Sequence, residues 1–325
     1  MDLTTPIDIT AINNTANQMQ PKIKRLMMNN IRETFAHFTK YPGDVRSTKP
    51  LLTFKEGSIM QPYDPTLANA KDIGVIDSRA LAVDVGMSFI KDEVERYRNT
   101  YLALTSDFSV KEKAKLPFAS WYLETITLVG LQDLYLLPYQ GVKAAGQNPQ
   151  DITDGYLRKI LNEITASNIT VGLGNLYELS ASATDYSATN IGDELKAQFA
   201  LLPAKTQEKG IDIHIPYRYK QMYKEWFKSE YPNITDGDVP TDFLDGTDKK
   251  AKFVWTTAMG TSRRVIMTSK TNLYYGVDSS SGEFGKTLVF YFQNNPYILA
   301  ATNKSVIGFQ IRTLDKREFN VNNLA

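Results

Sequence analysis

The longest regular pattern of apolar residues lies between Lys115 and Pro138, in the stretch KLPFASWYLETITLVGLQDLYLLP. Apolar side chains recur at helical spacing on one face and fill much of the opposite face, so the pattern predicts one long helix that is covered on both sides. Pro117 suits the first turn of this helix. Pro138 is expected to end it, because proline disfavours helical geometry at the preceding residue. Glu124 and Asp133 would be costly in a membrane, which favours the interior of a globular protein.

The chain before this helix shows three different patterns. Residues 1–20 are polar and lack apolar periodicity, which is typical of an arm. Residues 21–39 have apolar positions near helical spacing with basic side chains among them, and they predict a basic amphipathic helix. Residues 42–78 alternate short extended pieces with proline and glycine turns, and so long a segment with so little packing pattern is unusual inside a compact domain. We therefore expect a protruding loop or a hairpin that lies on something else.

The rest of the chain predicts an inserted α/β unit followed by a sheet. Alternating apolar residues predict a half-buried strand from Arg79 to Phe89, and helical spacing predicts a helix over 91–103. In the unit from about 137 to 252, the predicted elements are helices at 151–168 (with Asp151 or Thr153 as N-cap), 191–203 and 217–232 and a strand at 211–215. The predicted strands after it are 253–257, 263–269, 272–278, 286–293, 296–302 and 305–314. This terminal sheet is the expected partner of the long helix, which makes the unit between them an insertion.

Composition narrows the class of protein. The chain has 325 residues, of which 42% are hydrophobic and 22% are charged, and these fractions are typical of a soluble globular protein. The formal net charge of +1 gives no global field that would mark a nucleic-acid or membrane binder. The first residues lack the basic start and apolar core of a signal peptide, and the sequence has no cysteine. Synthesis in a cytoplasm is expected.

Motifs for catalysis or metal binding are missing from the sequence. The two histidines, His37 and His214, are far apart in sequence, and His214 is expected to point from a strand to one sheet face as a polar residue. The GLG at 172–174 lacks the third glycine of a dinucleotide-binding loop and is expected to be a turn. The acidic segment 233–250 lacks the closing Glu of a calcium loop, so a solvated loop is expected. We predict no catalytic, cofactor-binding or metal-binding residues and no cofactor.

Three stretches carry a resemblance to a known family. They are 78–103, 214–233 and 253–284, and the last is the most specific. It contains a Trp, then Met-Gly-Thr, a strand, Ser-Lys-x-Asn-Leu and Gly-x-Asp. In their order and combination the stretches resemble the major capsid proteins of tailed bacteriophages, especially those that infect Bacteroidetes, including the crAss-like group. The similarity covers roughly residues 78–320.

The resemblance implies an α+β fold of the Hong Kong type. Its expected parts are an N-terminal arm (1–41), an extended loop (42–90), the first part of a peripheral domain with the long spine helix (91–138), an axial domain (139–260) and the return strands of the peripheral domain with the C-terminus (261–325). The protein would then be a shell protein that forms pentamers and hexamers of an icosahedral head around double-stranded DNA. It would be assembled in the cytoplasm of the bacterial host and would reside in the virion capsid.

The resemblance also implies partners and contact residues. The expected partners are further copies of the chain, scaffolding, portal and decoration proteins, and packaged DNA bound without sequence preference, whereas no membrane contact is expected. The candidates for DNA contact on the inner surface are Lys22, Lys24 and Arg25. The candidates for contact between subunits through the extended loop are Leu52, Phe54, Met60 and Tyr63.

Three alternatives belong to other classes of protein. An encapsulin-like shell would share the fold and would enclose a protein cargo instead of DNA. A minor virion protein would have a low copy number or an external position. A soluble α/β enzyme would have Asp236, Asp238 and His214 as the first residues to test, and the absence of a catalytic constellation argues against it.

Overall fold

A computed structural model describes residues 35–56, 74–93, 134–180, 184–235, 237–278, 289–292 and 298–324. Within these ranges the chain folds into two five-stranded sheets, one two-stranded hairpin and a set of helices, which is a mixed α+β architecture. No helix in the described ranges is both long enough and apolar enough to cross a membrane.

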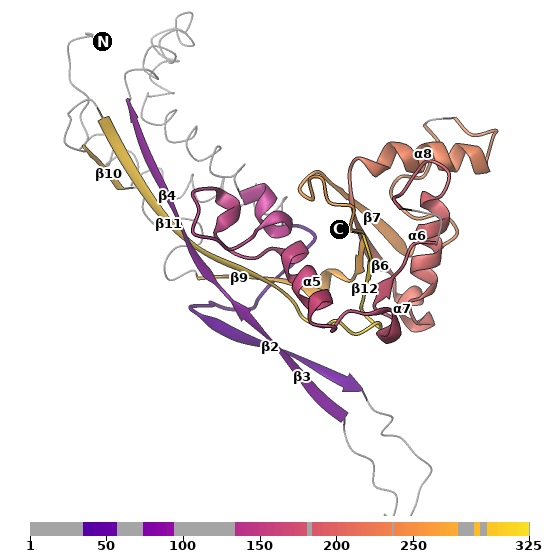
Figure 1. Cartoon of the computed structure of the whole chain (residues 1–325), viewed down its shortest axis with the longest axis horizontal. Coiled ribbons are helices and arrows are strands. Elements are labelled where there is room, and N and C mark those ends of the chain that lie inside the picture. Colours follow the sequence, from indigo (N-terminus) through magenta and orange to yellow (C-terminus); the bar gives the residue numbers. More distant parts are fainter. Residues whose placement is uncertain are drawn as a thin grey trace, which may run out of the picture.

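The first sheet is built around its longest strand. Its members are β1 (Thr39–Lys40), β4 (Asp84–Glu93), β9 (Leu273–Val277), β10 (Val289–Phe292) and β11 (Ile298–Ile311). Ile307 of β11 pairs with both Asp84 and Val277, so β4 and β9 lie on opposite edges of β11. The strands β4 and β11 run antiparallel beside each other over nearly their whole length (Figure 1). Because β1 adds to β9 in parallel, the sheet joins segments from both ends of the chain.

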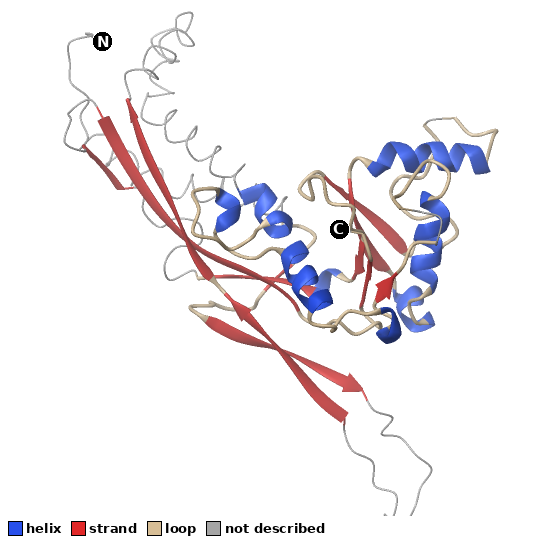
Figure 2. Cartoon of the chain, in the orientation of Figure 1, coloured by secondary structure: helices blue, strands red, loops and turns tan. Residues whose placement is uncertain are grey.

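The second sheet has the strand order β5-β12-β8-β6-β7. The strands are β5 (Leu176–Tyr177), β6 (Ile211–Pro216), β7 (Ala251–Thr256), β8 (Ile266–Thr268) and β12 (Phe319–Asn322). Three helices gather on the side of this sheet that faces away from β4 and β11 (Figure 2). They are α6 (Ile191–Ala200), α7 (Ala204–Lys209) and α8 (Tyr219–Glu230). The strands β8 and β12 pair in the same sheet as β6 and β7, although they lie within the 261–325 segment.

Each face of the second sheet belongs to a different hydrophobic core. The three isoleucines of β6 point to the helix side and pack with Trp226 and Tyr223 of α8. Phe319 and Val321 of β12 point to the opposite face and pack in a second core with Phe309 of β11. This is the alternation that a strand buried on both faces shows. The second sheet therefore separates two hydrophobic cores.

The core between the sheets receives contributions from short segments on either side. The helical residues 134–140 supply Leu137 and Tyr139, and the helix α5 (Tyr156–Thr165) supplies Tyr156 and Ile160. The turn after residue 34 adds Phe35 and Phe38. Short 3-10 helices complete the described structure: η1 (Pro149–Asp151), η2 (Val171–Leu173) and η3 (Lys270–Asn272).

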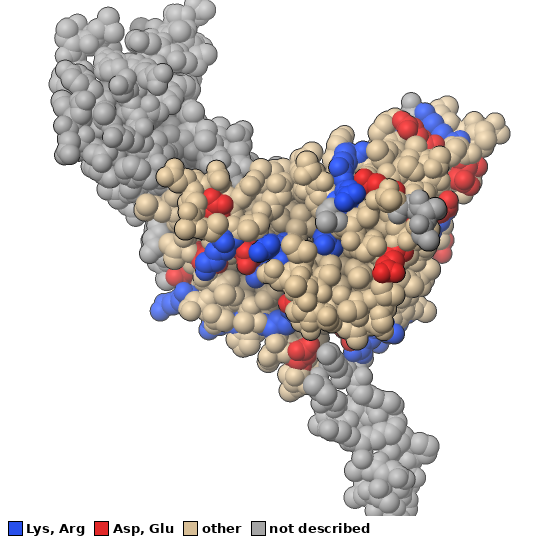
Figure 3. Space-filling model, in the orientation of Figure 1, with Lys and Arg blue, Asp and Glu red and all other residues tan. Residues whose placement is uncertain are grey.

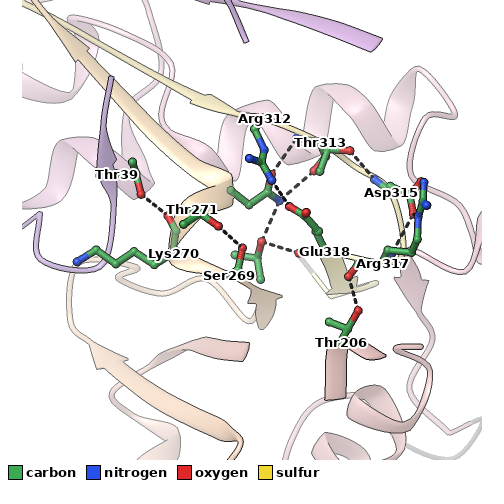
Figure 4. A network of polar contacts seen from close by, with 12 residues as sticks. Thr39, Thr206, Ser269, Lys270, Thr271, Arg312, Thr313, Asp315, Arg317 and Glu318 are labelled. Carbon is green, nitrogen blue, oxygen red and sulfur yellow. Dashed lines mark hydrogen bonds and ion pairs between the residues drawn. The ribbon is translucent and has the colours of Figure 1, made fainter. Parts of the chain in front are cut away.

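Polar side chains also connect the sheets. Arg312, just after β11, forms an ion pair of 2.5 Å with Glu318, just before β12 (Figure 4). Buried Asn272 donates to the carbonyl of Thr313 at 3.0 Å and accepts from its amide at 2.8 Å. Thr206 of α7 donates to the carbonyl of Arg317 at 2.5 Å. The link between β11 and β12 is thus held by bonds to both of its flanks.

Several predicted elements have different boundaries in the structure. The predicted end of the long helix at Pro138 is wrong, because residues 134–140 are helical and the Gly141 amide donates to the Leu137 carbonyl at 3.1 Å. The residues of that helix before 134 lie outside the described ranges. The single strand predicted over 79–89 is two strands, broken at Val83, where the backbone turns from the hairpin into β4. The two strands predicted at 296–302 and 305–314 are one continuous strand, β11.

Helix predictions near segment ends also need correction. Residues 91–93, predicted as the start of a helix, extend β4 because they pair with 298–300 of β11. Residues 35–39, predicted as the end of a helix, form a turn and the start of β1. The helix predicted from 151 begins at Tyr156 with Gly155 as its N-cap, so neither Asp151 nor Thr153 caps it. The strand at 211–215 is confirmed as β6 and the helix at 217–232 as α8.

Candidate interaction surface

A two-stranded hairpin extends away from both five-stranded sheets (Figure 1). It consists of β2 (Thr48–Glu56) and β3 (Gly74–Ala82), which are antiparallel with Thr48 opposite Ala82. The tip between them lies outside the described residues. A two-stranded ribbon has little stability by itself in water, so its position must come from its base or from another molecule.

The two faces of this hairpin have opposite exposure. On the face towards the body, Leu51 and Leu81 are buried in a small core with Val45. On the other face, the side chain of Leu52 is 56% exposed, that of Phe54 is 63% exposed and that of Ile76 is 57% exposed. Phe54 and Ile76 are directly paired across the strands, and Leu52 is two positions before Phe54, so the three share one face. We call Leu52, Phe54 and Ile76 the hairpin face.

The base of the hairpin is fastened to the first sheet by directed bonds. The Arg79 guanidinium donates through Nε to the Ile311 carbonyl at 2.8 Å and through Nη2 to Glu163 at 2.5 Å. The side chain of Gln310 donates to the Ala80 carbonyl at 2.6 Å. One planar guanidinium therefore bridges the hairpin, the end of β11 and helix α5, which is a geometry that Arg suits better than Lys.

The electrostatics at the base favour the charged form of Glu163. Burial raises the pKa of this carboxyl group, but hydrogen bonds from Arg79 and Asn168 outweigh burial, and the net pKa lies below the ordinary value. Asp84, at the start of β4, accepts a hydrogen bond from Thr153 at 2.8 Å and pairs with Lys143. These contacts fix the point at which the hairpin leaves the body.

Close backbone packing adds to the same junction. A side-chain carbon at Gly308 of β11 would come within 2.0 Å of the Ala82 carbonyl oxygen. Real contacts of this kind essentially never fall below about 3.0 Å, so only glycine lets the end of β3 cross β11 here. The angle between hairpin and body is therefore set by main-chain contact as well as by side chains.

The candidate contact residues proposed from the sequence fall into two groups. Leu52 and Phe54 lie on the hairpin face, and their role stays a prediction. The others lie outside the described residues: Lys22, Lys24, Arg25, Met60 and Tyr63. Sequence reasoning did not single out Ile76, because only the strand register places it opposite Phe54. The extended piece at 74–77 was the signal that could have found it.

Two of the three residues named for an enzyme, His214 and Asp238, are described, and they form hydrogen bonds with different partners. His214 is completely buried, and within the described ranges the one hydrogen bond of its ring joins Nδ1 to the Tyr139 hydroxyl at 2.8 Å. Asp238 accepts from Thr235 at 2.6 Å on the surface, and Asp236 lies outside the described residues. Among the described residues no group of three or more His, Cys, Asp and Glu side chains could hold a metal ion.

Two loop predictions differ in outcome. Gly174 closes η2 with a φ of 73°, so the GLG at 172–174 is a turn, as predicted. The acidic segment 233–250 is not wholly solvated, because Val239 and Leu244 enter the core with α8 and Asp245 pairs with Lys196 at 2.8 Å. The many Asp and Gly residues around Val239 and Leu244 favoured the prediction of a solvated loop.

Charges of both signs are interspersed on the face shown in Figure 3, and no patch of one sign dominates it. This distribution agrees with the formal net charge of +1. A surface of this kind supplies little of the electrostatic attraction on which non-specific binding of nucleic acid depends. Exposed apolar side chains of the described chain include the hairpin face and, in β4, Val85 and Met87.

Comparison with known proteins gives a fold. No protein-family model matches the sequence, and no curated protein matches it. A chain of the structure of the satellite phage P4 procapsid including size determination (Sid) protein is similar with a TM-score of 0.56 and 12% identity, and the match covers 92% of this chain and 98% of that one. A chain of the capsid of a native GTA particle has a TM-score of 0.59 and 12% identity, with 90% and 89% coverage.

A third similar structure is that of Gordonia phage Cozz, with a TM-score of 0.50, 12% identity and coverage of 90% and 86%. At this level of identity the likeness concerns the fold. In the three comparisons the match covers 90–92% of this chain. The chain has the fold found in structures of phage capsids.

Proposed function

We propose that the protein is the major capsid protein of a tailed bacteriophage, with the Hong Kong-type fold, and that it assembles into pentamers and hexamers of an icosahedral head around double-stranded DNA. The observation that carries this proposal is the match, over about nine tenths of the chain, to chains of a phage procapsid and a GTA capsid. The sequence stretches 78–103, 214–233 and 253–284 support the narrower assignment to phages of Bacteroidetes, including the crAss-like group.

The described parts fit the domains that such a subunit would have. The hairpin of β2 and β3 would be the extended loop within 42–90, and the first sheet with the helical residues 134–140 would belong to the peripheral domain. The second sheet with α6 and α8 would be the axial domain, assigned from the sequence to 139–260. The boundaries remain a proposal, and the pairing of β12 in the second sheet would place the residues 319–322 with the axial domain.

The hairpin face supplies a physical reason for assembly. Contiguous exposed apolar side chains on a monomer mark a surface that another molecule covers. The hairpin stands away from its own body, so its apolar face has no partner among the described residues of the chain. A second copy of the chain would cover it, and Met60 and Tyr63 would extend the same contact.

Near-neutral charge agrees with a shell that encloses DNA without binding it tightly. DNA affinity grows with the number of phosphates that Lys and Arg neutralise. The inner contacts proposed for Lys22, Lys24 and Arg25 would be weak and independent of sequence. Scaffolding, portal and decoration proteins would be further partners, the assembled protein would reside in the virion, and assembly would take place in the host cytoplasm.

The test is assembly of the purified chain, alone and co-expressed with its genomic neighbours, measured by light scattering and negative-stain microscopy. The double variant Leu52→Ser/Phe54→Ser should remain a folded subunit by circular dichroism and should fail to form rings or shells. The matched control is Val171→Ser/Leu173→Ser, which changes two residues of η2 that are 51% and 54% exposed, and it should assemble normally.

The outcomes separate the proposal from its alternatives. Closed shells or rings with five-fold and six-fold symmetry would support it, and nucleic acid inside the shells would distinguish them from an encapsulin-like shell with a protein cargo. A stable monomer under every condition would overturn the proposal. If the hairpin variant and its control assemble equally well, the proposed shell function is retained, but the hairpin face is not a contact that assembly requires.

A further inference from the structure

The chain's only two histidines meet at the junction of its two sheets, although 176 positions separate them in the printed sequence, about half of its length. The rings of His37 and His214 lie 6.3 Å apart, edge to face. His214 belongs to β6 of the second sheet, whereas His37 belongs to the turn that leads into β1 of the first sheet. Phe38, next to His37, stacks on His214 with a centroid distance of 6.1 Å.

His214 is held in a form that cannot readily take up a proton. Its Nδ1 shares a hydrogen bond of 2.8 Å with the hydroxyl of Tyr139, and its buried Nε2 has no hydrogen-bond partner among the residues that the structure describes. Burial, with a smaller contribution from His37, lowers the pKa of His214 to about 3. A neutral imidazole is therefore part of the packed junction, and a charged one would have to leave it or bring water in.

His37 is the solvent-facing member of the pair. Its side chain is only partly exposed, and burial lowers its pKa. Asp212 of β6 acts in the opposite direction, while Lys252 of β7 and Lys270 of η3 add to the lowering. The three charged groups around His37 thus come from β6, β7 and η3. Two of these groups are cationic.

The segment that carries His37 is attached to the β9 side of the first sheet. We call residues 35–45 the strap. Its strand β1 has two residues, and it adds to the edge strand β9 with bonds from the amides of Tyr41 and Val45 to β9 carbonyls at 2.9 and 3.1 Å. The hydroxyl of Thr39 donates to the Lys270 carbonyl at 2.9 Å (Figure 4). Phe35 and Phe38 provide its apolar anchors in the core between the sheets.

We propose that the strap is an acid-released latch: neutral His37 and His214 hold it in the junction of the two sheets, and protonation of this pair detaches it while the rest of the subunit stays folded. The proposal concerns a conformational device within one chain, and it does not depend on the shell function. Its structural basis is that His37 and Phe38 of the strap both pack on His214, and that Phe38 in turn packs on Phe35, so charging the imidazoles opposes the packing of the strap.

The direction of the pH effect follows from linkage. A histidine whose pKa is lower in the closed state than in the open state contributes stability above its ordinary pKa of about 6.5, and that contribution is lost as the pH falls. With a closed-state pKa of about 3 for His214, and an open state in which release of the strap exposes this ring to water and returns its pKa to about 6.5, the closed-to-open ratio falls about 25-fold between pH 7 and pH 5. Burial raises the pKa of Asp212, so this group acts with the opposite sign, in the more acidic range near its own ordinary pKa.

The test is hydrogen exchange of the purified full chain at about pH 7 and about pH 5, corrected for intrinsic exchange rates. Amides of the strap should lose protection about 25-fold or more. Amides of α8 should keep a clearly higher protection factor at both pH values, which separates release of the strap from global unfolding. The double variant His37→Gln/His214→Gln contains no imidazole, and the strap of this variant should respond to pH less than about threefold.

The single variant His37→Gln keeps the test decisive if the buried substitution at His214 prevents folding. Its strap should lose less protection on acidification than the strap of the unchanged chain. An equal pH response in the unchanged chain and in His37→Gln would show that His37 takes no part in the release, and it would overturn the proposal that the histidine pair is the latch. Loss of protection in the strap and α8 together, with the same free energy, would also overturn it, because the opening would then be global.

Discussion

The hairpin face and the helix side of the second sheet use the same kind of side chain in opposite ways. Phe253 of β7 is 5% exposed and packs edge to face on Tyr223 with a centroid distance of 4.9 Å, whereas Phe54 of β2 is 63% exposed. Both phenylalanines lie in strands that are rich in apolar residues. The difference shows that an apolar strand pattern predicts which side chains need to be covered. Within the described chain, Phe253 is covered and Phe54 is not.

The largest loss of stability is expected for a substitution in the core on the helix side of the second sheet. Phe253→Ala should destabilise the subunit by about 3–5 kcal/mol, because it removes a buried ring and leaves a cavity among Tyr223 and Trp255. Urea unfolding of the soluble subunit measures this change. A loss below about 1 kcal/mol would mean that the core can close over the cavity, and it would weaken the contrast with the hairpin.

The next effect concerns a buried polar side chain in β12. Asn322 accepts from the Val265 amide at 2.9 Å and donates to the Arg263 carbonyl at 2.9 Å. Asn322→Ala should cost about 1–3 kcal/mol, because it leaves buried backbone groups without partners. The neighbouring change Asn323→Ala, at an exposed position, should cost less than about 0.5 kcal/mol in the same urea titration.

A smaller effect is expected at the base of the hairpin. Arg79→Met should cost about 1 kcal/mol at neutral pH, since it removes the bonds to Ile311 and Glu163 from a partly buried site. The net pKa of Glu163 is lowered when folded, so the contribution of the ion pair is present above the ordinary carboxyl pKa and is lost as the pH falls below it. The stability difference between Arg79→Met and the unchanged chain should therefore shrink in acid.

The control for this site is Arg46→Met, at an exposed position near the same hairpin. It should change the free energy of unfolding by less than about 0.5 kcal/mol at any pH. A pH-dependent effect of equal size in both variants would show that overall charge, and not the Arg79 bridge, is responsible.

The smallest effect on the subunit is expected on the hairpin face itself. Phe54→Ala should change the free energy of unfolding by less than about 0.5 kcal/mol, because the ring is already mostly in water. The measurement is the same urea titration that is used for Phe253→Ala. If Phe54→Ala costs several kcal/mol instead, the ring is covered within the subunit and the comparison fails.

The sequence predicts the element types of this fold better than their ends. The strand at 211–215 and the helix at 217–232 follow from regular periodicity, and the pattern identifies an apolar face in each. The strand β11 was predicted as two, because the polar run Thr302–Ser305 interrupts its apolar pattern. Backbone pairing with β4 carries the strand through that run, and pairing between distant segments leaves no local signal.

The candidate surface could be predicted only in part for the same reason. An apolar strand without a local packing pattern drew attention to Leu52 and Phe54, but Ile76 joins them only through register. The polar alternation of β6 indicated a sheet face for His214, and it could not indicate that a second core covers that face. Contacts between His37 and His214 require the folded junction, which no local spacing encodes.

The contact between the hairpin and β11 is expected to form late in folding. The bond from Gln310 to Ala80 joins residues 230 positions apart, whereas β2 and β3 are neighbours in sequence. Contacts that close long loops form slowly, because their chain entropy must be lost before the contacts stabilise anything. The hairpin can thus form while β11 is still unpaired, and its apolar face is then exposed on an unfinished subunit. Such an intermediate is prone to aggregation, so the folding yield should fall as the protein concentration rises and should increase when chaperones are present.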